Sequence, residues 1–154
     1  MNYQQQAVAG MNPVELIVAL YDGMVRFLYR AIAAIETRDA TERRTAIARV
    51  LEILMHLQSR LRADIGGSSA RALSEFYTSI FALCLEGSRL ESAERLKEAI
   101  ACIRDVREAW SVAARDPEVL RLLAEQGGGA VSAVVIPAKL PYGTADTAHS
   151  SWTA

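Results

Sequence analysis

The feature that most constrains the fold is a spacing of three and four between apolar residues, repeated in four segments that short polar turns separate. In the first segment this spacing runs from Leu16 to Ile35. It places the apolar side chains on one face of an α-helix. Long helices joined by short turns pack antiparallel to their neighbours. The sequence therefore predicts an all-α fold, an antiparallel up-down four-helix bundle over residues 12–115.

Capping residues indicate where the helices begin and end. Asn12-Pro13 predicts the start of the first helix, because asparagine is a good N-cap and proline suits the first helical position. We expect this helix to end near Thr37. The second helix is expected over residues 41–64, ended by the adjacent glycines Gly66-Gly67. The third helix follows these glycines, and the fourth begins near Ser92.

The last part of the chain has a different character. Asp116-Pro117 predicts the start of a short extra helix over residues 116–126. After three consecutive glycines the residues become small, polar and proline-containing. A lone strand over residues 131–137 has no predicted pairing partner. We therefore expect residues 127–154 to form a flexible C-terminal tail.

The composition is that of one folded domain. Of the 154 residues, 51% are hydrophobic and 23% are charged, which excludes a disordered chain over most of the length. Lys and Arg number 17 against 18 Asp and Glu. The chain therefore lacks the basic excess that nucleic-acid-binding proteins usually show. The arginines between residues 38 and 49 alternate with acidic residues, as on a solvated helix face. Cys84 and Cys102 are expected to be buried free thiols.

The sequence also lacks targeting signals and catalytic motifs. Residues 1–6 do not resemble a secretory signal, and no apolar run approaches the roughly 20 residues of a membrane helix. We therefore expect a cytoplasmic protein without membrane insertion. His56 and His149 have no metal-ligand neighbour one helical turn away, and no Glu-x-x-His or CxxC motif is present. We expect no catalysis, no metal site and no cofactor.

The first helix carries more apolar surface than one core-facing stripe requires. Its central apolar residues fill an arc of about 140° at 100° per residue, and further apolar residues extend the arc to roughly 220°. These further residues are Val14, Val18, Val25, Tyr29 and Ile32. On the second helix Ile53 and Met55 also fall outside the central stripe. A contiguous exposed apolar stripe favours binding of a partner helix in a groove.

Short motifs from the N-terminus to the fourth helix keep a specific order and spacing. They are Tyr3, Val8, Asn12-Pro13, Leu20-Tyr21-Asp22-Gly23, Gly66-Gly67, Phe76-Tyr77 and Arg107-Glu108-Ala109-Trp110. In this order and spacing the chain resembles the flagellar secretion chaperone FliS family. That family has a tyrosine, a valine, a proline helix start, Leu-Tyr-Asp-Gly, a Gly-Gly break, Leu-Tyr and Arg-x-x-Trp at the corresponding places.

The resemblance implies a chaperone and not an enzyme. Members of the family bind the disordered C-terminal segment of newly made flagellin, prevent its premature polymerisation and deliver it to the flagellar type III export gate. The client wraps around the bundle and folds into helices in apolar grooves. The family's N-terminal segment covers part of this surface when no client is bound, so residues 1–11 are expected to form a lid.

The candidate partner-binding residues combine the resemblance with the apolar surplus. They are Tyr3, Val8, Val18, Tyr21, Val25, Tyr29, Ile53 and Val106. For Tyr21, as for Tyr77 and Trp110, a place in the core is the competing interpretation. Two other functions stay open: a structural bundle that uses its apolar stripe to form a homodimer, and a chaperone for a different export substrate.

Overall fold

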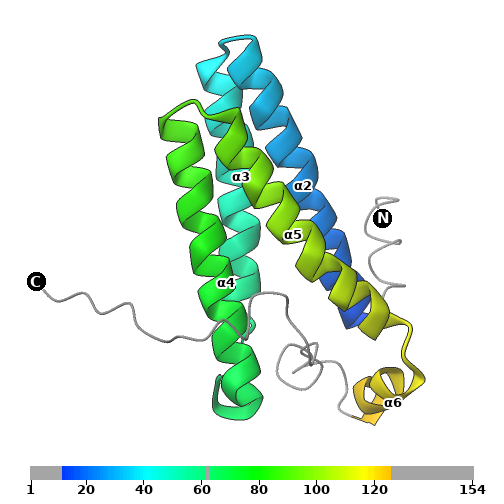
Figure 1. Cartoon of the computed structure of the whole chain (residues 1–154). Coiled ribbons are helices and arrows are strands. Elements are labelled where there is room, and N and C mark those ends of the chain that lie inside the picture. Colours follow the sequence, from blue (N-terminus) through cyan, green and yellow to red (C-terminus); the bar gives the residue numbers. More distant parts are fainter. Residues whose placement is uncertain (1–11, 62, 126–154) are drawn as a thin grey trace, which may run out of the picture.

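The computed structural model describes residues 12–61 and 63–125, so the predicted lid over residues 1–11 and the predicted tail over residues 127–154 lie outside the described residues. The described elements are α2 (Pro13–Glu36), α3 (Ala40–Ser59), α4 (Ala63–Arg89), α5 (Ala93–Ala114) and α6 (Pro117–Glu125). The first four run up and down beside one another, and the short α6 follows at one end (Figure 1). The predicted all-α, up-down four-helix bundle with a short extra helix is confirmed.

Local capping chemistry places the helix starts where the sequence predicted them. The Asn12 side-chain oxygen accepts a hydrogen bond from the Glu15 amide at 2.8 Å, and the Glu15 carboxylate accepts one from the Asn12 amide at 3.1 Å. This reciprocal pair satisfies two amides that have no partner within the helix. Ser92 caps α5 in a similar way by accepting from the amide of Arg95.

The predicted end of the second helix is wrong, whereas the predicted break at the glycine pair is present. Helix α3 ends at Ser59, and Gly67 lies inside the segment assigned to α4, where it interrupts the helical backbone with φ 56° and ψ −134°. Only glycine adopts this conformation at little cost. Leu61, just beyond the end of α3, packs against the core, and no glycine or proline marks that turn in the sequence.

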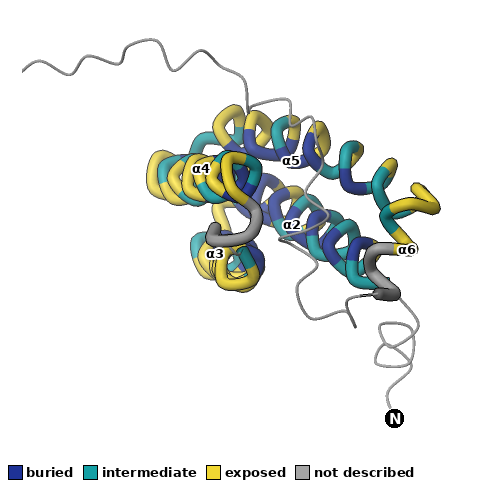
Figure 2. The backbone as a smooth tube through the Cα atoms, turned by 90° about the horizontal axis from the view of Figure 1, so that it is seen from below, coloured by how far each residue is buried: buried dark blue, intermediate teal, exposed yellow. Residues whose placement is uncertain are grey.

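The core lies between all four long helices, with the buried residues facing inward (Figure 2). Its largest fully buried side chains include Trp110, Tyr21, Met24, Leu28, Leu54, Leu73, Ile80, Leu96 and Ile103. Helix α2 packs against both α3 and α5, and α4 also packs against both α3 and α5. The four helices therefore form a ring in which α2 and α4 lie diagonally opposite.

Packing against two neighbours uses part of the apolar surplus that the sequence shows on α2. Val14 is fully buried and Ile32 is 6% exposed, so neither belongs to an exposed stripe. Val18 and Val25 are half-buried against the core, and Tyr29 is 46% exposed. The exposed part of the stripe is thus narrower than predicted, because α2 packs against two neighbouring helices.

One arginine departs from the predicted solvated face. Arg44 and Arg49 are exposed as expected, whereas Arg43 is buried. Its guanidinium reaches the carboxylate of Glu91, which lies in the turn between α4 and α5. The prediction failed for Arg43 because its position faces this turn, and a charged side chain is buried only where a partner neutralises it.

The two cysteines differ in accessibility. Both are free, Cys84 is buried and Cys102 is half-buried. Burial raises the pKa of the Cys84 thiol to about 12. Because the thiolate is the reactive form, we expect a thiol reagent at pH 8 to modify Cys102 in the folded protein and to reach Cys84 only after unfolding. Mass spectrometry of the labelled protein checks this; rapid modification of Cys84 without denaturant would contradict it.

The same burial predicts a loss of stability at alkaline pH. The folded-state pKa of Cys84 lies above its ordinary value of 9.0, so the unfolded chain releases this proton first. The contribution of the protonated Cys84 thiol to the free energy of unfolding is complete below pH 9. It is lost as pH rises towards 12, at up to about 1.4 kcal/mol per pH unit. Burial also raises the pKa of Tyr21 and of Tyr77, which act in the same direction. Urea unfolding at pH 8 and pH 10 measures the loss, and C84A should show less of it.

Candidate partner-binding grooves

Two grooves on the described part of the bundle differ in chemical character. The first, here called the α3–α4 groove, has a volume of about 450 Å³. The second, the α2–α5 groove, has a volume of about 610 Å³. The residues that line the α3–α4 groove are Leu54, Met55, Gln58, Ser59, Tyr77, Thr78 and Phe81. Those that line the α2–α5 groove are Asp22, Val25, Arg26, Tyr29, Arg104, Arg107 and Glu108.

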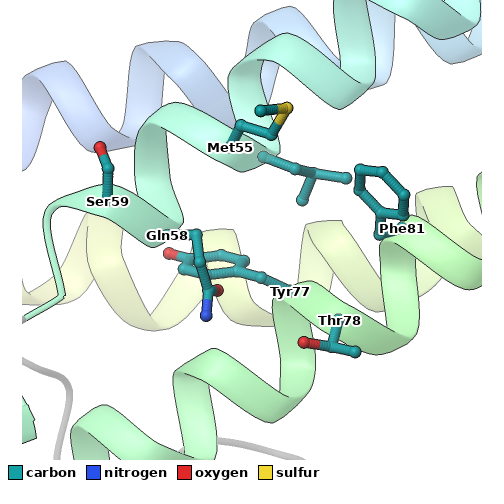
Figure 3. Close-up of a pocket in the computed structure, with 7 residues that line it drawn as sticks. Met55, Gln58, Ser59, Tyr77, Thr78 and Phe81 are labelled. Atoms are coloured by element: carbon teal, nitrogen blue, oxygen red, sulfur yellow. The ribbon is translucent and has the colours of Figure 1, made fainter.

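The α3–α4 groove has no charged residue in its lining and is mainly apolar. Leu54 and Tyr77 are buried beneath it, and Phe81 is half-buried on its α4 side. Met55 stands on the α3 side and is 64% exposed (Figure 3). Burial of this exposed apolar side chain by an apolar partner would stabilise the complex.

Polar side chains connect the two helices beside this groove. The Gln58 amide on α3 donates a hydrogen bond to the Ser74 hydroxyl on α4. One turn further along α4 the Thr78 hydroxyl donates to the Ser74 carbonyl at 2.9 Å. The groove therefore combines apolar walls with a few amide and hydroxyl groups, the usual composition of a peptide-binding or ligand-binding site.

A buried hydrogen-bonded chain holds the floor of the α3–α4 groove in place. The Trp110 indole donates to the Tyr21 hydroxyl at 3.1 Å, and the Tyr21 and Tyr77 hydroxyls are 2.7 Å apart. The two tyrosine rings also meet edge to face, with centroids 6.2 Å apart. Burial raises the pKa of both hydroxyls above the ordinary tyrosine value, at which the group is already neutral at physiological pH. Three helices are thereby fixed relative to one another beneath the groove.

The α2–α5 groove is rimmed by charges. Arg107 donates to the two Asp22 carboxylate oxygens, from Nε at 2.6 Å and from Nη2 at 3.2 Å. The Arg104 guanidinium lies 5.5 Å from the centre of the Tyr29 ring, in cation–π contact. Asp22 and Arg107 remain partly exposed, so their pairing orients α2 against α5 more than it stabilises the fold.

The structure separates the predicted partner-binding residues into different places. Val25 and Tyr29 line the α2–α5 groove. Val18 is half-buried against the core on the same helix. The side chain of Ile53 extends from α3 towards α2. Its Cδ1 is 3.4 Å from the position that a Cβ on Gly23 would take. These residues therefore do not form one continuous surface.

Two further predicted residues are buried, and two lie outside the described part of the chain. Tyr21 is fully buried, which confirms the competing interpretation of this residue as part of the core. Val106 is also buried, so it does not line an open groove as predicted, because this face of α5 forms the core. Tyr3 and Val8 lie outside the described residues.

The prediction missed most of the α3–α4 groove. None of the predicted partner-binding residues lines this groove. Met55 supplied the one usable signal, because it falls outside the core stripe of its helix. Which residue of α4 stands opposite it depends on the packing of the two helices and not on the spacing along either one.

Within residues 12–61 and 63–125, no group of three or more His, Cys, Asp or Glu side chains is arranged to hold a metal ion. In the same part of the chain no helix is both long and apolar enough to span a membrane.

Comparison with known proteins agrees with this architecture. A family model described as flagellar protein FliS matches residues 1–117. The chain belongs to the FliS family. A flagellar secretion chaperone FliS of Campylobacter jejuni is 32% identical over 108 residues, which cover 70% of this chain and 84% of the relative.

Two more distant FliS proteins match a similar share of the chain. The flagellar secretion chaperone FliS of Bacillus subtilis is 26% identical over 111 residues, which cover 72% of this chain and 82% of the relative. That of Vibrio cholerae is 22% identical over 103 residues, which cover 67% of this chain and 76% of the relative. The family match includes the bundle and both grooves, whereas residues 118–154 lie beyond it.

Proposed function

We propose that this protein is a cytoplasmic export chaperone. It binds the disordered C-terminal segment of flagellin in its surface grooves, prevents premature polymerisation and delivers the client to the flagellar type III export gate. Membership of the FliS family supports the chaperone role. The observation that carries the binding mode is the uncharged α3–α4 groove with the exposed Met55 at its edge.

Energetics favour a long client segment over a short one. Burying one Leu-sized side chain contributes about 1.5–3 kcal/mol. Ordering a disordered segment costs on the order of 2–5 kcal/mol, and association itself carries a further entropic cost. A few side chains in one groove therefore give little net affinity. A client that also reaches the α2–α5 groove, where Val25 and Tyr29 are accessible, gains the missing burial.

The test is calorimetric titration of the full chain with a peptide of the flagellin C-terminal segment. We expect micromolar or tighter binding and at least a tenfold weakening in M55D, because a carboxylate would lose its hydration in an uncharged groove. Met55 is already 64% exposed, so this change should leave the fold intact. The matched control is L90D, since Leu90 is 51% exposed in the turn after α4 and outside both grooves.

Each alternative function gives a distinct result. If wild-type chain binds no flagellin peptide at micromolar concentration but sediments as a dimer that M55D disrupts, the groove serves self-association. If flagellin peptide does not bind but another export substrate does, the chaperone has a different client. Equal affinities for wild type, M55D and L90D would place flagellin binding away from the α3–α4 groove.

A further inference from the structure

We infer that residues 131–137 of this chain occupy its own α3–α4 groove and compete there with the client. The competition rests on the proposed function, whereas the docking of the segment does not. Residues 131–137 lie outside both the described residues and the family match. The occupant would thus be a segment that this chain adds to the matched family region.

The chemistry of the segment matches this groove and not the other one. Its sequence is Val-Ser-Ala-Val-Val-Ile-Pro, and no charged residue occurs from Gly127 to Ala138. The α3–α4 groove lining is uncharged as well. In the α2–α5 groove the same segment would cover five charged side chains and remove their hydration without offering a countercharge. Apolar burial therefore selects the α3–α4 groove.

The groove lies towards the end of the bundle at which α6 is found. Helix α6 ends at Glu125 and lies at the end of the bundle where α3 ends and α4 begins (Figure 1). The groove is lined by the last third of α3, from Leu54 to Ser59. Eight residues lie between Glu125 and Val134, so the nine steps from one to the other span about 30 Å when extended. That is about the full length of α3 at 1.5 Å per residue.

The groove also suits an extended backbone. Val131, Val134, Val135 and Ile136 are β-branched, and Pro137 disfavours a helical conformation for the residue before it. An extended segment needs partners for its amides and carbonyls. Gln58, Ser59 and Thr78 line the groove and supply side-chain amide and hydroxyl groups for this purpose. Valine and isoleucine side chains can then cover Phe81 and Met55.

Tethering makes even weak docking effective. A short flexible connection gives an effective concentration in the millimolar range. A segment with a dissociation constant of similar size then occupies the groove for half of the time or more. The client must displace it, so its apparent affinity falls about twofold to tenfold. The tail would thereby favour long clients, which bind at several places, over short apolar peptides.

The first experiment detects docking without a client. The methyl signal of Met55 is recorded by NMR in full-length wild type and in the double variant V134D/V135D. We expect the signal to shift in V134D/V135D, because the uncharged groove excludes the carboxylates, and to remain unchanged in the matched control A145D/T147D. An unchanged Met55 signal in V134D/V135D overturns the inference. A shift that grows with protein concentration overturns it as well, because the segment then docks on a second copy.

The second experiment measures the competition. Flagellin peptide is titrated into full-length wild type, V134D/V135D and A145D/T147D. We expect V134D/V135D to bind the peptide twofold to tenfold more tightly than the other two. Equal affinities of all three overturn the competition. If the peptide binds to none of them, the proposed function fails while the Met55 signal still decides whether the segment docks.

Discussion

Replacing Trp110 with alanine is expected to lower the free energy of unfolding by about 3–5 kcal/mol, the usual cost of removing a large aromatic side chain from a core. Trp110 is 1% exposed and is among the largest buried side chains. Its indole also donates to the Tyr21 hydroxyl, which in turn contacts Tyr77 on α4. W110A therefore creates a cavity and removes the hydrogen bond that links α5 to α2. Guanidinium unfolding monitored by circular dichroism measures the loss.

Conservative variants separate the two contributions of Trp110. W110F keeps most of the ring and loses the hydrogen bond, so it should cost less than W110A. Y21F leaves the Trp110 N–H buried without its acceptor, at about 1–3 kcal/mol. A loss below 1 kcal/mol in W110A would show that this side chain is not packed in the core.

Alanine at Gly87 and alanine at Gly23 are expected to change stability in opposite directions. A Cβ on Gly87 would lie 2.6 Å from Leu96 Cδ2 and 3.2 Å from Arg95 Cβ, which is closer than atoms approach without displacement. Leu96 is fully buried and cannot move freely. Overpacking costs about 1–3 kcal/mol, which offsets or exceeds the roughly 1 kcal/mol that alanine gains over glycine in a helix. We expect G87A to lose up to about 2 kcal/mol.

Gly23 provides the matched control on another helix. There a Cβ would lie 3.4 Å from Ile53 Cδ1, an ordinary contact. The helical preference of alanine then dominates, and G23A should gain up to about 1 kcal/mol. Parallel urea unfolding of both variants measures the difference. If G87A were as stable as wild type, α4 and α5 would not approach each other as closely at this turn as the structure has them.

The sequence predicted the helices and most of their starts because those features depend on local chemistry. Asn12-Pro13, Ser92 and Asp116-Pro117 supply capping groups or a fixed φ within one turn of the helix they begin. The spacing of apolar residues likewise defines which face of each helix is buried, whatever the neighbours are. The motifs from Tyr3 to Trp110 also indicate the FliS family without reference to any tertiary contact.

The tertiary structure alone decided which apolar edges are covered and which stay open. Val14 and Ile32 are buried because α2 packs between α3 and α5, and Arg43 is buried because it meets Glu91. The α3–α4 groove exists because Met55 on α3 and Phe81 on α4, which are far apart in the sequence, lie at the facing edges of two packed helices. Spacing along one helix fixes the direction of a side chain. The distance to the neighbouring helix, which sets burial, results from packing of the whole bundle.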